Sequence, residues 1–195
     1  LLEQTGTFAE FDYRESVLDA VDQRERQTVA DRVSAQHDRT ALSDAVICGV
    51  WKSGHHQAVV IALDPVLLGS GLGIVSAGKV GSAIRAATER HMPVILFAAG
   101  GSRPQPAGLI GATIGARLQA VVADLHRAAQ PFFCVLAHGV GGSLIEGLAA
   151  DADYTLAEPD VELAAGFRVD LVASRLDQIA TVTSLLTMLA GGDEL

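Results

Sequence analysis

Two stretches of the chain follow one plan. Residues 93–102 read PVILFAAGGS, and residues 131–143 read PFFCVLAHGVGGS. Each stretch begins at a proline, continues as an uncharged apolar run and ends in a Gly-Gly-Ser turn. A short apolar run between turn residues is typical of a strand that is buried on both faces, as in a parallel sheet. Helical patterns follow the two turns, at about 107–129 and at 143–150.

The segments before these stretches extend the pattern. Two apolar runs, 45–51 and 57–63, flank a polar turn that contains Gly54, and this arrangement predicts a β-hairpin. A Gly-rich loop at 69–73 then leads into a helix predicted from about residue 78 to residue 91.

The segments after these two stretches continue the same pattern. A fourth apolar run occupies 154–157, and an amphipathic helical pattern runs from about residue 172 to residue 189. Repetition of strand, Gly-rich turn and helix predicts an α/β fold with a buried parallel sheet and flanking helices.

The start of the chain has a different character. Residues 8–39 are charged, almost without Gly or Pro, and apolar at roughly helical spacing. We therefore predict a helical N-terminal arm over residues 1–40 and one α/β domain over residues 41–195.

Composition narrows the class of protein. Of 195 residues, 49% are hydrophobic and 19% are charged, which suits one compact domain with a sizeable core. The net charge of −9, with only Lys52 and Lys79 as lysines, argues against nucleic acid as a partner. No apolar run is long enough to span a membrane, and the opening Leu-Leu-Glu-Gln lacks the features of a signal peptide, so we expect a cytoplasmic protein.

Cysteine usage gives no sign of a metal. Cys48 and Cys134 lie in apolar runs, where a free cysteine behaves as a small hydrophobic residue. No Cys, His, Asp or Glu residues stand at the spacing of a zinc finger or of a His-Glu-x-x-His motif, so no metal site is predicted.

The two glycine pairs are the candidates for chemistry. Gly100-Gly101 and Gly141-Gly142 each follow a predicted strand and precede a helix. Free backbone N–H groups and the positive end of a helix dipole would then face one crevice, as a developing oxyanion requires. The alternative is a purely structural turn with a capping box, formed by Ser102 with Gln105 or by Ser143 with Glu146.

Other polar residues near these turns have two interpretations each. Glu146 is placed to act as a general acid or base, but a capping role explains it equally well. His138, at a predicted strand end, and His55 and His56, in the hairpin turn, are more typical of structural residues. Four cations lie near the Gly-rich elements and would suit a phosphate-bearing ligand such as coenzyme A, or a solvated surface: Lys79, Arg85, Arg103 and Arg117.

Several motifs in one order resemble a known family. The segment 99–105, AGGSRPQ, is similar to the S-G-G-A-R-M-Q motif of the β subunit of bacterial acetyl-CoA carboxylase carboxyltransferase. The segment GVGGS at 139–143 resembles that family's second oxyanion turn, and 69–79 keeps the spacing of its Gly-rich loop ending in lysine. The resemblance runs from about Leu1 to Val169 and extends more distantly to the β subunit of malonate decarboxylase.

The resemblance implies a fold and a site. It implies a crotonase (ClpP-like) fold that binds acyl-CoA and holds its enolate with N–H groups at Gly100-Gly101 and Gly141-Gly142. Substrate contacts would come from six further residues: Gly71, Gly73, Lys79, Ser102, Arg103 and Ser143. No covalently bound cofactor is implied. Biotin would arrive on another chain, through an α-type subunit or a biotin carboxyl carrier, and an acyl carrier protein or a second copy of the chain are further partners.

The chain also departs from the family. Two cysteines are too few for the family's four-Cys zinc ribbon, and its Met-Gln-Glu-Gly segment is replaced by PQPA at 104–107. The hypothesis is therefore an acyl-CoA carboxyltransferase β-type subunit. The alternatives are a biotin-independent malonyl-thioester decarboxylase, a hydratase, and a non-catalytic partner subunit.

Overall fold

In the part of the chain that the structure describes, seven strands form one sheet, and their order across the sheet is their order along the chain. The computed structural model describes residues 6–12, 45–64, 74–99, 109–137, 143–159 and 168–172, with residues 31, 34, 35, 38, 161, 181 and 184. The strands are β1 (Thr7–Glu10), β2 (Val46–Ser53), β3 (His56–Leu63), β4 (Val94–Ala98), β5 (Phe132–Leu136), β6 (Tyr154–Ala157) and β7 (Leu171–Val172).

The sheet is mixed, whereas the sequence pattern predicts a parallel sheet. Strands β1, β2 and β3 pair antiparallel, and β3 to β7 pair parallel. The predicted hairpin is confirmed: Ser53 pairs with His56 around Gly54 and His55. Gly54 has a φ of +58°, which is typical of the first central residue in a tight hairpin turn.

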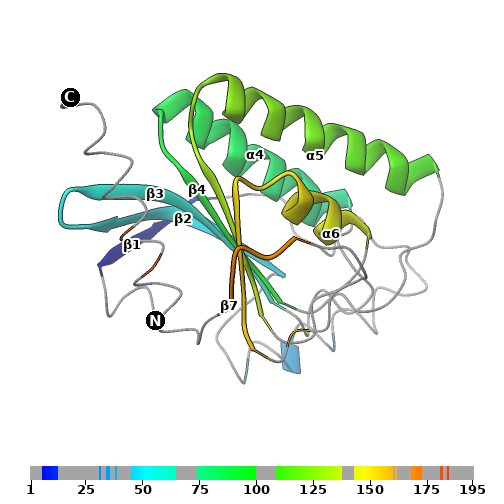
Figure 1. The fold of residues 1–195 in the computed structure, drawn as a ribbon. Helices are drawn as coiled ribbons and strands as arrows, with labels where there is room; N and C mark the ends of the chain where they lie inside the picture. The colour runs from blue at the N-terminus through cyan, green and yellow to red at the C-terminus, as the bar shows by residue number, and fades with distance from the viewer. Residues whose placement is uncertain are drawn as a thin grey trace.

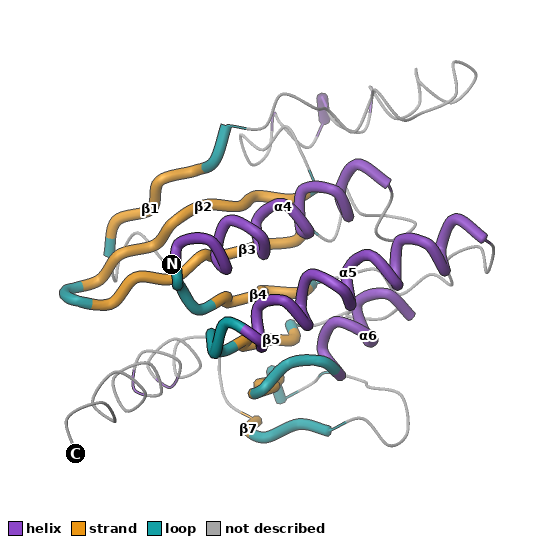
Figure 2. Tube along the Cα trace, turned by 90° about the horizontal axis from the view of Figure 1, so that it is seen from above, coloured by secondary structure: helices purple, strands orange, loops and turns teal. Residues whose placement is uncertain are grey.

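Three helices connect the parallel strands. They are α4 (Ile74–Arg90), α5 (Leu109–Arg127) and α6 (Ser143–Ala150). Each crossover joins neighbouring strands in the same direction, so right-handed connections place all three helices on one face of the sheet. Figure 1 shows α4, α5 and α6 on that face, and Figure 2 shows them side by side above the strands.

Alternate residues of the strands enter two apolar clusters. The larger cluster lies between sheet and helices and includes Ile61, Leu96 and Phe132 from strands and Ile84 and Leu125 from helices. The smaller cluster lies on the opposite face: Trp51, Ala58, Val60, Ile95, Phe133, Val135 and Leu156. Burial on both faces explains why the parallel strands read as continuous apolar runs rather than as alternating ones.

Helices α4 and α5 end in the same way. His91 and Ala129 follow the two helices with left-handed φ values of 53° and 54°. The next N–H group donates back into the helix, from Met92 to Ala87 at 2.9 Å and from Gln130 to Leu125 at 3.2 Å. These are Schellman caps, and they turn the chain directly into the strand that follows each helix.

The structure corrects three predicted boundaries. The arm predicted to be helical from residue 8 is wrong at Phe8–Glu10, which pair with the free edge of β2 as part of β1. Helix α4 begins at Ile74 rather than near residue 78. Leu171–Val172 form β7, so the terminal helix does not begin at Val172. Both strand errors have one cause, because edge pairing depends on a partner that local periodicity cannot show.

Other parts of the predicted arm and terminal helix lie outside the described residues. Residues 31, 34, 35 and 38 are helical, as are 181 and 184. The division at residues 40 and 41 stays a prediction. Within the described part of the chain, no helix is long and apolar enough to cross a membrane.

Candidate functional site

The two predicted oxyanion turns leave the sheet side by side. Ala98 at the end of β4 is in register with Leu136 at the end of β5. The next N–H group along, that of Ala137, donates to the carbonyl of Ala98 at 2.8 Å. Because these neighbouring strands end at the same level, the segments that carry Gly100-Gly101 and Gly141-Gly142 start from adjacent points on the carboxyl edge of the sheet.

Helix N-termini are directed to the same edge. Helix α4 returns the chain from the end of β3 to the start of β4, and α5 and α6 make the equivalent returns, so all three begin at the carboxyl edge. Neither α4 nor α5 has an acidic residue in its first turn. Their positive dipole ends are therefore not offset by a carboxylate of their own, and a negative charge would be stabilised there.

The glycines themselves lie outside the described residues. This holds for Gly71 and Gly73 as well as for Gly100, Gly101, Gly141 and Gly142, and for Ser102, Arg103 and His138. The structure does place Ser143, which is the first residue of α6 and follows Gly142 directly. The assignment of site residues stays a prediction, supported by where the strands end and the helices begin.

Lys79 is the predicted site residue that the structure describes most fully. It lies in the second turn of α4 and is 7% exposed, although lysine is rarely buried. Ser76, one turn earlier on the same side, is also buried. The structure thus places Lys79 in the N-terminal part of α4, the part that lies toward the carboxyl edge of the sheet.

The other candidates divide between the site and the surface. Glu146 is half-buried in the first turn of α6, close to the second glycine pair. Arg85 and Arg117 are exposed on α4 and α5, and Arg85 donates to Ser82 at 3.0 Å, as expected for a solvated helix face. These two arginines are therefore surface residues.

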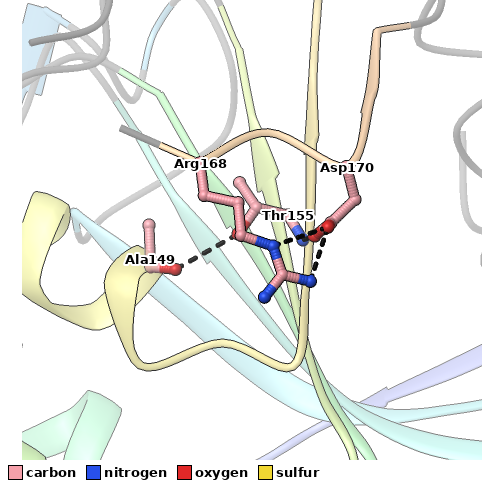
Figure 3. Close-up of polar contacts among 4 residues, drawn as sticks. All are labelled: Ala149, Thr155, Arg168 and Asp170. Carbon is pink, nitrogen blue, oxygen red and sulfur yellow. Dashed lines mark hydrogen bonds and ion pairs between the residues drawn. The ribbon is translucent and has the colours of Figure 1, made fainter. Parts of the chain in front are cut away.

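A network of polar contacts fixes the far end of α6 to the sheet (Figure 3). The Thr155 hydroxyl donates to the carbonyl of Ala149 at 3.1 Å, and the Thr155 N–H donates to Asp170 Oδ2 at 2.8 Å. Arg168 binds Asp170 Oδ1 through Nε at 2.8 Å and through Nη2 at 2.7 Å. The hydrogen bond from the Thr155 N–H is the main cause that holds the pKa of Asp170 below its usual value; burial acts in the opposite direction, and Arg168 lowers the pKa further. Helix α6 begins directly after Gly142 in the sequence, so the network stabilises the helix that follows the second glycine pair.

Both cysteines are free and buried, as the sequence predicts. Burial raises the pKa of the Cys134 thiol to about 12. The thiolate is the reactive form of cysteine, so Cys134 has no role as a nucleophile. No cluster able to hold a metal ion occurs among the residues that the structure describes.

Sequence reasoning missed a cleft at the opposite edge of the sheet. Histidines from the β2–β3 turn and from the ends of α4 and α5 line it, together with Asp153 and Tyr154 at the start of β6. These residues are far apart in the sequence, and only the strand register brings them together. The turn histidines were interpreted singly, and no local pattern linked them to His91 or His126.

The fold and the order of motifs can now be compared with known proteins. The chain is 29% identical to the acetyl-coenzyme A carboxylase carboxyl transferase subunit beta of Clostridium botulinum strain Okra, over 84% of this chain and 56% of the relative. The chain is similar to carboxyltransferase β subunits. It spans about half the length of the curated relatives that it matches first, and no protein-family model matches it.

Solved structures agree with this likeness. The Pseudomonas malonate decarboxylase hetero-dimer is 25% identical, with a TM-score of 0.53 over 71% of this chain and 61% of that chain. The transcarboxylase 12S core, solved with methylmalonyl-coenzyme A, is 14% identical, with a TM-score of 0.61 over 75% of this chain and 37% of that chain. The predicted crotonase-type fold and the predicted family resemblance are confirmed.

Proposed function

We propose that the chain is a β-type subunit of an acyl-CoA carboxyltransferase, which stabilises a thioester enolate while a carboxyl group moves to or from the acyl α-carbon. The observation that supports the proposal is that β4 and β5 end in register with each other, and in the sequence each of these strands is followed by a Gly-Gly pair. The similarity to carboxyltransferase β subunits supports the same reaction class.

The site works through position and charge. In the enolate, negative charge develops on the former carbonyl oxygen of the thioester. N–H groups at Gly100-Gly101 and Gly141-Gly142 would donate to that oxygen, each contributing about 3–4 kcal/mol in the transition state. Glycine suits both turns because a side chain would keep the backbone away from the substrate.

The remaining assignments surround this pair of turns. Gly71, Gly73, Ser102 and Ser143 would line the acyl thioester, while Arg103 and Lys79 would face its negative charges. The acyl-CoA is a substrate rather than a resident cofactor. Biotin would reach the site on a partner, either an α-type subunit or a biotin carrier, and the complex would act in the cytoplasm.

Calorimetric titration with acetyl-CoA and malonyl-CoA tests the proposal. We expect binding with a Kd on the order of micromolar. Gly142→Pro should weaken it about tenfold or more, because proline removes a backbone donor. Gly147→Ala is the matched control on α6, since no atom lies within 4 Å of the added Cβ. Equal affinity in the chain and in the Gly142→Pro variant would contradict the assigned turn.

Decarboxylation is the second candidate. It is favoured by the structural likeness to the Pseudomonas malonate decarboxylase hetero-dimer. Loss of carbon dioxide from a malonyl thioester generates the same enolate and needs no biotin. Release of carbon dioxide from malonyl-CoA by the chain without biotin would favour this reaction over carboxyl transfer.

A further inference from the structure

The cleft at the amino edge of the parallel strands has no part in the proposed reaction. It has a volume of about 1130 Å³ and lies between the β2–β3 turn, the C-terminal ends of α4 and α5, the start of β6, and Arg168. Ligand pockets for small molecules span roughly 300–1,000 Å³, so this cleft is ample for one. The predicted oxyanion turns leave the sheet at its other end.

The lining is strongly basic for an acidic protein. Four of the six histidines in the chain line the cleft, His55, His56, His91 and His126, together with Arg90 and Arg168. The lining carboxylate in the described part of the chain is Asp153. With a net charge of −9 for the whole chain, a chance gathering of this kind is not what composition favours.

Asp153 does not neutralise this group. Its Oδ2 accepts the backbone N–H of Phe132 at 2.7 Å and lies 3.4 Å from Nε2 of His126. The carboxylate is thus committed to joining β5, β6 and α5. The Arg90 guanidinium, at the end of α4, takes no part in this arrangement and lies over the Phe11 ring.

Both arginines keep N–H donors for a ligand. Arg168 binds Asp170 through Nε and Nη2, which leaves part of its guanidinium fork. The Arg90 guanidinium carbon lies 5.0 Å from the centre of the Phe11 ring. A guanidinium held over an aromatic ring still has N–H donors in its own plane.

Helix dipoles explain only part of the basic lining. A base in the last turn of a helix is favoured by the negative dipole end, and this accounts for Arg90 on α4 and His126 on α5. It does not account for His55 and His56 on the hairpin, or for Arg168 beyond β6. Donors from four separate elements converge on one space.

We propose that this cleft binds a small anion that carries more than one phosphate group. Guanidinium forks match phosphate oxygens, and imidazoles add donors and, when protonated, positive charge. The donors surround a space much larger than one tetrahedral ion, which favours a ligand with two or more phosphates. The site is separate from the thioester site and does not depend on the proposed carboxyl transfer.

Titration calorimetry with inorganic pyrophosphate, at constant ionic strength, tests the site. We expect saturable binding with a Kd on the order of 100 μM or lower. The Arg90→Gln/His91→Asn double variant should bind about tenfold more weakly or worse, the loss expected for a charge-assisted hydrogen bond.

Controls separate the site from bulk charge and from the thioester site. Arg127→Gln also removes one arginine charge, at the residue next to His126 in the sequence. The Arg127 side chain, however, is 77% exposed and pairs with Asp124. This variant should leave the Kd within about twofold. Gly142→Pro should also leave the Kd for pyrophosphate unchanged. If the double variant does not fold, His55→Gln, in the hairpin turn, is a second variant that tests the cleft. Absence of saturable binding, equal weakening in Arg127→Gln, or loss in Gly142→Pro would overturn the proposal.

Discussion

At the scale of the residue, Asp170 links two parts of the sheet through several polar contacts. Its carboxylate accepts the N–H of Thr155, a residue that is 3% exposed, and it binds Arg168. The Asp170 N–H donates in turn to the Thr155 carbonyl at 2.8 Å. One side chain therefore joins β6 to the segment that enters β7, and through Thr155 it is linked to α6.

Truncation of Asp170 should destabilise the fold. Asp170→Ala leaves a buried N–H without its acceptor, and we expect a loss of about 1–3 kcal/mol in the free energy of unfolding. Asp170→Asn retains an acceptor oxygen and should lose less. Arg168→Ala, at a side chain that is 76% exposed, should cost less than about 1 kcal/mol. Urea denaturation measures all three, and an Arg168→Ala loss as large as that of Asp170→Ala would contradict this order.

The contribution of the Asp170 charge should depend on pH. Its pKa is lowered in the folded chain, so the stabilisation is complete above the usual aspartate pKa of about 3.9 and is lost as the pH falls through the lowered value. The stability difference between the chain and its Asp170→Asn variant should therefore shrink below about pH 4. Denaturation at a series of acidic pH values checks it, and a difference that grows in acid would contradict it.

The two thiols should not react with thiol reagents in the native protein. Cys48 and Cys134 are each buried, and the pKa of Cys134 is raised to about 12. At about pH 8, a thiol reagent should label neither residue until denaturant is added, because reaction requires an accessible thiolate. Mass spectrometry before and after unfolding counts the labels, and fast native labelling of Cys134 would contradict the burial.

At the scale of the element, β1 depends on one glycine of its neighbour. A Cβ at Gly49 would stand 2.4 Å from the carbonyl oxygen of Ala9 and 2.6 Å from Cζ of Phe8. Gly49→Ala should push β1 off the sheet edge at a cost of about 1–3 kcal/mol. Trp51, the single tryptophan, is 1% exposed and pairs with Phe8 of β1. In Gly49→Ala, loss of β1 should expose Trp51, so its fluorescence emission should shift to the red.

Gly147 supplies the contrast for this variant. It lies within α6, where an added Cβ meets nothing within 4 Å. Gly147→Ala should stabilise the helix by about 0.5–1 kcal/mol and leave the Trp51 emission unchanged. An emission shift in this variant, or its absence in Gly49→Ala, would contradict the assigned role of β1.

The central elements could be predicted from sequence, and the edges could not. The runs that became β4 and β5 are apolar because both faces are covered, so their composition alone identifies them. Strands β1 and β7 are short and held by neighbours: β1 by the edge of β2, and β7 by β6 with the help of Asp170. The start of α4 was missed because Gly78, with its exposed backbone and open surroundings, was interpreted as a helix start instead of an interior residue.

At the scale of the whole molecule, the two edges of the sheet differ in how far sequence reveals them. The sequence suggests a site at the carboxyl edge because Gly-Gly-Ser motifs follow β4 and β5 along the chain, and this site stays a prediction. The basic cleft at the amino edge draws on His55, His91, His126 and Arg168, which no single motif contains. Its recognition required the strand register and the two helix caps.

Carboxyl transfer should need a second subunit. In the proposed function, biotin reaches the site on a partner chain. We expect the isolated chain to bind acetyl-CoA but to move no carboxyl group from malonyl-CoA to free biotin until a carboxyltransferase α subunit is added. A coupled assay of acetyl-CoA formation measures this, and full turnover by the chain alone would contradict the need for a partner.

The strands have the same order in the sheet as in the chain, and this has a consequence for biosynthesis. No strand has to enter between two that are already paired, because β1 to β7 line up as they are translated. Each newly emerged strand from β4 onward adds to an existing edge, and its helix covers the face just formed. The sheet can thus grow from one side to the other at the ribosome, with β7 and the Asp170 contacts completing it last.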